Sequence, residues 1–470
     1  MGTQAGRRTG IGRRTGALVA AAAAAAAVGA VTALPAQAVP AQAVPAQALP
    51  AQAVAARDRA GEALGADARA GGALRAGGTS VPPYAFDGSA QRIQGAASSL
   101  DAKPLKTGQT YRDTLKRNGK VYYRVDLDTK RNTYVSVVAV PKPGGKVEYG
   151  DGFKVSIQDN SGTDCGYQEA DFGSGQYARP LAAYARRIVD PDTSSCQKQG
   201  AYYVLVERES AAASTPDDWE LELRYVTEPL LKQAGPTALP EAWASATPAP
   251  PAGGQQKRQG GDGFHGAVSL REGEWRADIR PGQTLFYRVP VDWGQQLFAS
   301  AELGSGTEGD LVSNALTLSL DNPALGFVDM NTVSYDGKPA TLALDPLRPV
   351  AHENRTSYQE ATSGMRFAGW YYLTATLSPE IAAEYGDKPV PLTLRVNVEG
   401  SPKTAPAYDA DPGVFSVTAD DREAAANGAT GADATTNGTM QVVAAAGIGT
   451  GTVLLLGLGA WTLLARRRAA

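Results

Sequence analysis

The sequence predicts an all-β protein that contains two tandem antiparallel β-sandwich domains, at residues 84–228 and 263–400. Three observations support this prediction. One pattern of residues occurs twice, apolar and polar side chains alternate with a period of two, and turn-forming pairs separate the alternating segments.

The duplication extends over most of both predicted domains. Corresponding segments follow in the same order, with residues 111–115 matching 275–279, 121–125 matching 285–289, 202–205 matching 371–374, and 221–224 matching 392–395. Each copy has roughly 130–145 residues, which is a usual size for one domain. The chain therefore carries one domain type twice.

The alternation predicts half-buried antiparallel strands. In residues 121–127, Val121, Tyr123 and Val125 share one face, and polar residues occupy the other. Residues 221–225, 316–320 and 391–398 follow the same rule, and pairs such as Asn118-Gly119 and Asp336-Gly337 favour turns between strands. A short helix is expected near residues 182–188.

The N-terminus has the features of an export signal. Two Arg-Arg pairs precede an apolar run at residues 17–31, and a small-residue cleavage pattern ends at Ala38. We expect a signal peptide at residues 1–38 and a low-complexity spacer at 39–83. The general secretory route is the default, and the paired arginines leave the twin-arginine route open.

The rest of the chain predicts a membrane anchor. Residues 229–262 resemble a Pro/Gly/Ala-rich linker, and residues 401–441 resemble a disordered stalk. Residues 442–465 are apolar and uncharged, and arginines follow in the tail at 466–470, which predicts one transmembrane helix with a cytoplasmic C-terminus. The protein would lie in the cell membrane with its bulk extracytoplasmic.

The predicted transmembrane helix contains Gly447 and Gly451, a spacing that lets two helices approach closely. A homodimer through this helix is one interpretation. The simpler one is that glycine and alanine are common throughout this chain.

Charge and cysteine content narrow the function. The formal net charge of −3 gives no reason to expect a nucleic acid partner. Cys165 and Cys196 are the only cysteines, and outside the cytoplasm such a pair is expected to form a disulfide. They lack the Cys-x-x-Cys spacing of redox-active pairs.

The sequence offers no recognisable catalytic set, metal cluster or cofactor motif. A Ser/His/Asp hydrolase would need His265 or His352, but Gln94 occupies the position of His265 in the first copy, and no Gly-x-Ser-x-Gly motif occurs. Residues 159–164 resemble the start of a calcium loop, yet Ala170 stands where the ligating Glu would be. We favour a turn there, with weak calcium binding left open.

Three residues are candidates for a binding face: Arg124, Arg288 and Trp293. Arg124 and Arg288 occupy matching positions on the polar face of a predicted strand, where an anion could bind; a solvated sheet face is the simpler interpretation. Trp293 matches Thr129 near a strand end and is expected to be exposed, as in a carbohydrate-stacking platform.

The repeated pattern resembles the bacterial pre-peptidase C-terminal domain. The resemblance rests on Gly108-Gln109-Thr110, the aromatic pair before Arg-Val at residues 122–125 and 286–289, and the closing strands at 202–206 and 219–223. It implies a jelly-roll-like sandwich without catalytic activity, of a kind often attached to secreted peptidases and sometimes binding collagen or glycans. No peptidase domain accompanies the repeats in this sequence.

Together these features predict a non-catalytic, membrane-anchored extracytoplasmic protein. Its duplicated sandwiches would bind another cell-envelope protein. The alternative is a module that binds glycan or cell-wall polymer, and a hydrolase with an unrecognised site is a third interpretation.

Overall fold

The computed structural model describes residues 81–241 and 243–433, which all belong to one compact unit. The predicted signal peptide (1–38), transmembrane helix (442–465) and cytoplasmic tail (466–470) lie outside the described residues, as do nearly all of the spacer and the Gly447–Gly451 pair. Within the described part of the chain, no helix has the length and apolar character needed to cross a membrane.

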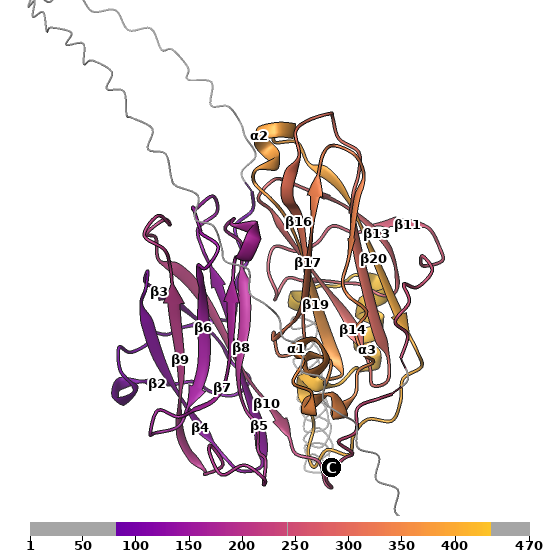
Figure 1. Ribbon diagram of the computed structural model, residues 1–470. Coiled ribbons are helices and arrows are strands. Elements are labelled where there is room, and N and C mark those ends of the chain that lie inside the picture. The colour runs from indigo at the N-terminus through magenta and orange to yellow at the C-terminus, as the bar shows by residue number, and fades with distance from the viewer. Residues whose placement is uncertain (1–80, 242, 434–470) are drawn as a thin grey trace, which may run out of the picture. The chain divides into compact units, whose positions relative to one another are not determined.

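The first sandwich consists of two facing sheets (Figure 1). One sheet contains, in spatial order, β1 (Gln91–Arg92), β3 (Thr110–Leu115), β10 (Trp219–Pro229), β5 (Arg131–Val140) and β8 (Leu181–Arg187). The other contains β2 (Lys103–Pro104), β4 (Lys120–Leu127), β9 (Gly200–Glu209), β6 (Gly152–Gln158) and β7 (Asp164–Asp171).

The second sandwich repeats this plan. Its first sheet contains β11 (Gln255–Lys257), β13 (Gly273–Ile279), β20 (Val390–Glu399), β15 (Gln296–Leu303) and β18 (Ala340–Ala343). Its second contains β12 (Val268–Ser269), β14 (Thr284–Val291), β19 (Gly369–Leu377), β16 (Val312–Asp321) and β17 (Phe327–Tyr335). The described helices are α1 (Glu360–Gly364), α2 (Ile381–Tyr385), α3 (Ala419–Asn427) and four short 3₁₀ turns, η1 (Ser99–Asp101), η2 (Gly173–Gly175), η3 (His352–Thr356) and η4 (Gly413–Phe415).

Each strand of one sandwich has a counterpart at the same sheet position in the other, which confirms two tandem β-sandwiches. The sheets are not wholly antiparallel. The short edge strands β1, β2, β11 and β12 each pair in parallel with β3, β4, β13 and β14, respectively. Such parallel pairing lets the chain enter one sheet and cross to the next.

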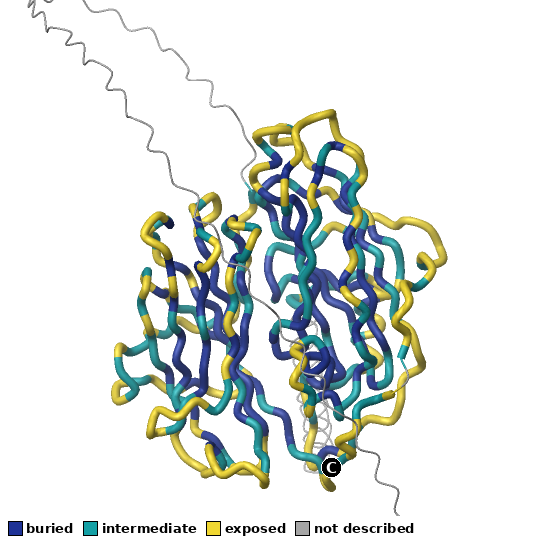
Figure 2. The backbone as a smooth tube through the Cα atoms, viewed as in Figure 1, coloured by how far each residue is buried: buried dark blue, intermediate teal, exposed yellow. Residues whose placement is uncertain are grey.

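The predicted alternation positions the two cores. In β4, Tyr123, Val125 and Leu127 are buried, and Asp126 between them is exposed. Burial follows the strands, and exposed residues concentrate in the loops at their ends (Figure 2). Full burial of one large apolar side chain contributes about 1.5–3 kcal/mol, so the cores supply much of the stability.

The helix expected near residues 182–188 does not form. Residues 182–187 belong to β8, which pairs with β5 over seven positions. The alanines favour a helix locally, but Ala183 and Ala185 are fully buried in the sandwich core as strand residues. Tertiary packing therefore overrides local propensity.

Residues expected to be linker and stalk pack onto the sandwiches. Strand β11, inside the expected linker, pairs with β13, and Leu231 forms a β-bridge with Tyr408. In the expected stalk, Phe415 is fully buried, and a Thr418 capping box begins α3. The described residues 401–433 are thus ordered structure, because a few buried aromatics fix a segment that is otherwise polar.

The two sandwiches meet through the outer faces of their sheets. Strand β5 is buried on both faces, and its outward residues Val138 and Val140 cluster with Phe264, Phe286 and Tyr372 of the second sandwich. A second cluster joins Tyr134, Tyr184 and Val226 to Ala324, Phe367 and Phe415. We call this contact region the junction.

Candidate functional site

The junction encloses a polar cavity of about 460 Å³. We call it the junction cavity, and both sandwiches contribute to its lining: Asp87, Ser89, Gln91, Gly108, Gln109, Thr110, Glu222, Arg224, Phe264, His265, Arg288, Leu325, Tyr372 and Gly431. Its mixture of charged, amide and hydroxyl groups with two aromatic rings suits a polar ligand.

Arg288 is the most unusual residue of this cavity. It lies on β14 and is only 6% exposed. Its Nε donates to Ser269 Oγ at 2.9 Å, and its guanidinium lies 4.0 Å from the centroid of the Trp370 ring. Its Nη2 is buried and has no hydrogen-bond acceptor among the described residues. Burial lowers the pKa of Arg288, and the nearby Tyr372, Asp421 and Asp433 oppose that change.

Two carboxyl groups face the same cavity with different proton affinities. Burial raises the pKa of Glu222, although its oxygens accept from the Asp87 amide at 2.8 Å and the Tyr84 hydroxyl at 3.2 Å. Burial also acts on Asp87, but hydrogen bonds from the Ser89 amide and hydroxyl outweigh it and lower the pKa of Asp87. Asp87 is therefore the firmly ionised member.

Neither histidine is arranged as the base of a nucleophile. His265 Nδ1 lies 3.6 Å from Asp87 Oδ2, and His352 Nδ1 lies 2.8 Å from Arg355 Nη1. Burial, followed by the charges of Arg355 and Arg366, lowers the pKa of His352 to about 4. Within the described residues, neither ring hydrogen-bonds a serine, threonine or cysteine.

The three candidate residues have different surroundings. Arg124 is partly exposed and pairs with Asp126 at 3.2 Å, as a solvated sheet face predicts. Arg288, at the matching position, is buried in the junction. Trp293 is only 4% exposed, because the chain after β20 covers it: its carbonyl accepts from the Lys403 amide, and Tyr408 lies beside its ring. The expectation of an exposed Trp293 platform is wrong.

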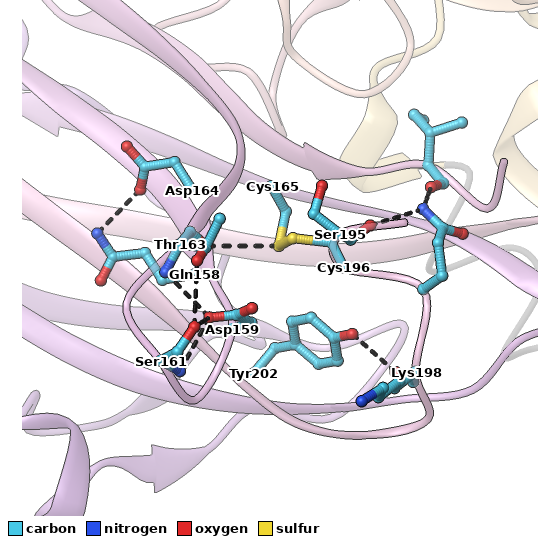
Figure 3. The surroundings of a disulfide bond; sticks show 12 residues. Gln158, Asp159, Ser161, Thr163, Asp164, Cys165, Ser195, Cys196, Lys198 and Tyr202 are labelled. Carbon is cyan, nitrogen blue, oxygen red and sulfur yellow. Dashed lines mark hydrogen bonds between the residues drawn. A yellow bond between two sulfur atoms is a disulfide. The ribbon is translucent and has the colours of Figure 1, made fainter. Parts of the chain in front are cut away.

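The disulfide is confirmed (Figure 3), and neither of its cysteines lines the junction cavity. It joins Cys165 on β7 to Cys196 in the β8–β9 connection, 31 residues apart. Beside it, Asp159 Oδ1 accepts from the amides of Ser161 and Thr163, both at 2.9 Å, and these bonds together with the Ser161 hydroxyl lower the pKa of Asp159. The carboxylate thus closes a turn, as the sequence favoured.

In the described ranges, no group of three or more His, Cys, Asp or Glu side chains could hold a metal ion.

Comparisons with known proteins identify no family. No protein-family model matches the chain, and no curated protein matches its sequence. The resemblance to the pre-peptidase C-terminal domain, and the jelly-roll-like topology that it implies, therefore stay predictions.

Solved structures show only remote likeness. A Parabacteroides distasonis protein expected to be secreted is 10% identical and has a TM-score of 0.16, covering 62% of this chain and 89% of its own. A tandem CBM22 domain of Paenibacillus barcinonensis Xyn10C is 12% identical with a TM-score of 0.17, covering 63% and 92%. The ANX1 ectodomain of Arabidopsis thaliana is 8% identical, also with a TM-score of 0.17, covering 64% and 92%. The β-sandwich assignment rests on the strand pairing of this chain itself.

The sequence predicted Arg288 as a candidate binding residue, but it did not predict the other charged residues of the junction cavity, Asp87 and Glu222. Asp87 precedes the first strand, and Glu222 occupies an outward strand position that normally faces water. One available clue was the nearly unbroken apolar run at residues 134–140, which indicates a strand buried on both faces. It would have shown that the outer face of this sheet is covered.

Proposed function

We propose that the protein is a non-catalytic extracytoplasmic binding protein whose junction cavity receives a group carried by another cell-envelope protein. In this proposal, residues 442–465 anchor it in the cell membrane as a single pass with a cytoplasmic C-terminus. The export signal, the apolar C-terminal run and the duplicated sandwiches support this arrangement.

The observation that carries the proposal is the open Nη2 donor of Arg288. A buried polar group without a partner costs about 1–3 kcal/mol, and more when it is charged. A carboxylate entering the junction cavity would pair with the guanidinium of Arg288, which lines the cavity, through a charge-assisted hydrogen bond. An acidic side chain or a C-terminal carboxylate of a partner protein supplies such a group.

The duplication provides a matched control for the test. Arg288→Gln removes the charge in the cavity, and Arg124→Gln makes the same change at the corresponding exposed position of the first sandwich. Tagged full-length protein is crosslinked in cells through a photoreactive residue at Gln109, which lines the cavity, and the captured proteins are identified by mass spectrometry. We expect one envelope protein with the wild type and Arg124→Gln, and its loss with Arg288→Gln. Equal capture by all three proteins would refute the proposal.

A glycan or wall polymer is the second candidate. The amide, hydroxyl and carboxyl groups of the cavity, together with Phe264 and Tyr372, could hold a sugar that carries a carboxylate. Trp370 contacts Arg288 and offers a fluorescence signal. If this candidate is right, crosslinking captures no distinct protein, and isolated acidic wall polymer changes the tryptophan emission of the wild type but not of Arg288→Gln.

A further inference from the structure

A second cavity, of about 190 Å³, lies between strands β16, β17 and β19 of the second sandwich and the chain around β8 of the first. It is smaller than the junction cavity, and we call it the β16 cavity. Its walls combine the apolar side chains of Phe264, Phe327 and Met330 with several hydroxyl and carboxyl groups.

Asp321 brings a buried carboxyl group without a partner to the β16 cavity. It is the last residue of β16 and is only 4% exposed. Within the described part of the chain, its carboxyl forms no hydrogen bond and no ion pair, yet both of its oxygens keep accessible surface. Burial is the only cause that raises its pKa, to about 7, so no neighbouring charge compensates it. A buried carboxylate normally has a cationic or hydrogen-bonding partner, and a ligand can supply one in this cavity.

Two hydroxyl groups lie on the same face of the sheet as Asp321. Ser319 and Asp321 point away from the core of the second sandwich, because the leucines that alternate with them point into it. Thr374 on β19 lies directly opposite Ser319. Both residues line the cavity, and neither hydroxyl forms a hydrogen bond with another described residue. This face therefore offers a ligand one carboxyl group and two hydroxyl oxygens.

The charges around the cavity favour a cationic ligand. Three further carboxyl groups line the cavity and are exposed, those of Glu169, Asp171 and Glu360. Arg179 also lines it, but its Nη2 donates to the Phe172 carbonyl at 3.2 Å. Its guanidinium is not among the causes that shift the pKa of Asp321. Asp321 is thus left without a cation from the protein.

We propose that the β16 cavity binds a primary ammonium group carried on a short apolar chain. Such an ammonium has three N–H donors, which match the Asp321 carboxylate and the hydroxyls of Ser319 and Thr374. The apolar chain behind it packs against Phe327 and Met330. A free alkylamine and a lysine side chain of a partner protein share this chemistry. The charged groups of this site do not line the junction cavity, so either proposal can fail alone.

Butylamine, butan-1-ol and Nα-acetyl-L-lysine N-methylamide test the proposal. Butan-1-ol has nearly the shape of butylamine but no charge, and the lysine derivative carries the same aminobutyl group on a peptide backbone. Binding to the purified full-length protein in detergent is measured by titration calorimetry at pH 8, where Asp321 and both amines are mostly ionised. We expect butylamine to bind at least tenfold more tightly than butan-1-ol, a difference of about 1.4 kcal/mol or more. Whichever amine binds more tightly identifies the source of the ammonium.

Asp321→Asn keeps the shape of the side chain and removes its charge. We expect both amines to bind at least about tenfold more weakly to this variant, and butan-1-ol to bind as it does to the wild type. Asp329→Asn is the matched control: Asp329 lies on β17 but does not line the cavity, and its carboxyl accepts from the Asp345 amide at 2.9 Å. This control should leave the affinity for the amines nearly unchanged.

Three results would overturn the proposal. The first is that neither amine binds to the wild type at about 10 mM. The second is equal amine affinity in the wild type and in Asp321→Asn, with thermal unfolding used to verify that the variant is folded. The third is equal binding of butylamine and butan-1-ol to the wild type, which decides the question without any variant.

Discussion

At the scale of single residues, matching sequence positions have different environments. Arg124 and Arg288 align, yet Arg124 pairs with Asp126 and is partly exposed, whereas Arg288 is buried above the Trp370 ring. The alternation predicts which face of its own sheet each arginine occupies. It carries no information about what covers that face, and the second sandwich covers Arg288 with residues far away in the sequence.

Asp321 should reduce the stability of the ligand-free protein as the pH rises. Its folded pKa of about 7 exceeds the ordinary aspartate pKa of 3.8, so between these values the folded state holds a proton that the unfolded state has lost. Stability then falls with rising pH by roughly 1.4 kcal/mol per unit in that window. We expect Asp321→Asn to unfold at the same temperature as the wild type near pH 4 and at a higher temperature at pH 8.

The measurement is thermal unfolding at a series of pH values. Asp336→Asn is a suitable control, because Asp336 lies at an exposed turn and its pKa is lowered rather than raised. A stability difference between Asp321→Asn and the wild type that does not grow from pH 4 to pH 8 would contradict the expectation.

At the scale of elements, the strands of the two sandwiches were predictable, but the packing of the segment that follows the second sandwich was not. The repeated alternating segments correspond to β3, β4, β9 and β10 and to their counterparts β13, β14, β19 and β20. Residues 401–433 were expected to be a stalk because their composition is polar and small. Two isolated aromatics in this segment, Tyr408 and Phe415, are buried against the sandwiches, and the average composition does not reveal such residues.

Phe415→Ala should therefore destabilise the folded unit. The ring of Phe415 is fully buried, stacks on Phe367 at 4.5 Å between centroids, and meets Tyr134 edge-on at 5.5 Å. Removal of a buried phenylalanine ring costs about 3–5 kcal/mol. We expect a clear fall in the denaturant midpoint, whereas Glu423→Ala, at an exposed position on α3, should change it little. Equal midpoints for both variants would indicate that residues 401–433 act as a stalk.

At the scale of the whole molecule, the duplication predicts the fold of each sandwich but not how the two sandwiches pack against each other. Each copy contributes a different outer sheet face to the junction: the face bearing Tyr134 and Val138 from the first copy, and the face bearing Phe286 and Tyr372 from the second. The residues on these two faces need not be similar in sequence. The faces belong to non-equivalent sheets of the two copies, and they contact each other. The junction is consequently where internal sequence comparison is least informative, and both cavities adjoin it.

The charged network at the junction should couple the two sandwiches. Glu228 accepts from Asn132 Nδ2, the Tyr134 hydroxyl and the Tyr408 hydroxyl at 2.7–2.9 Å. Arg366 is buried beside Tyr134 and Tyr184; burial opposes its charge, but these two tyrosines and Glu228 raise its pKa. Glu228→Gln replaces the charged acceptor of these three hydrogen bonds and removes one of the charges that raise the pKa of Arg366. A hydrogen bond to a charged group contributes about 1.5–3 kcal/mol, so we expect a loss of that order.

A double-mutant cycle tests this coupling. Arg366→Met in the Glu228→Gln background removes the uncompensated cation and keeps an apolar side chain of similar length, so we expect it to recover a large part of the lost unfolding free energy. Denaturant unfolding of the wild type, both single variants and the double variant gives the coupling energy. Additive losses would mean that Arg366 and Glu228 act independently. A non-additive result obtained in one cooperative transition would show that the network holds both sandwiches in a single folding unit.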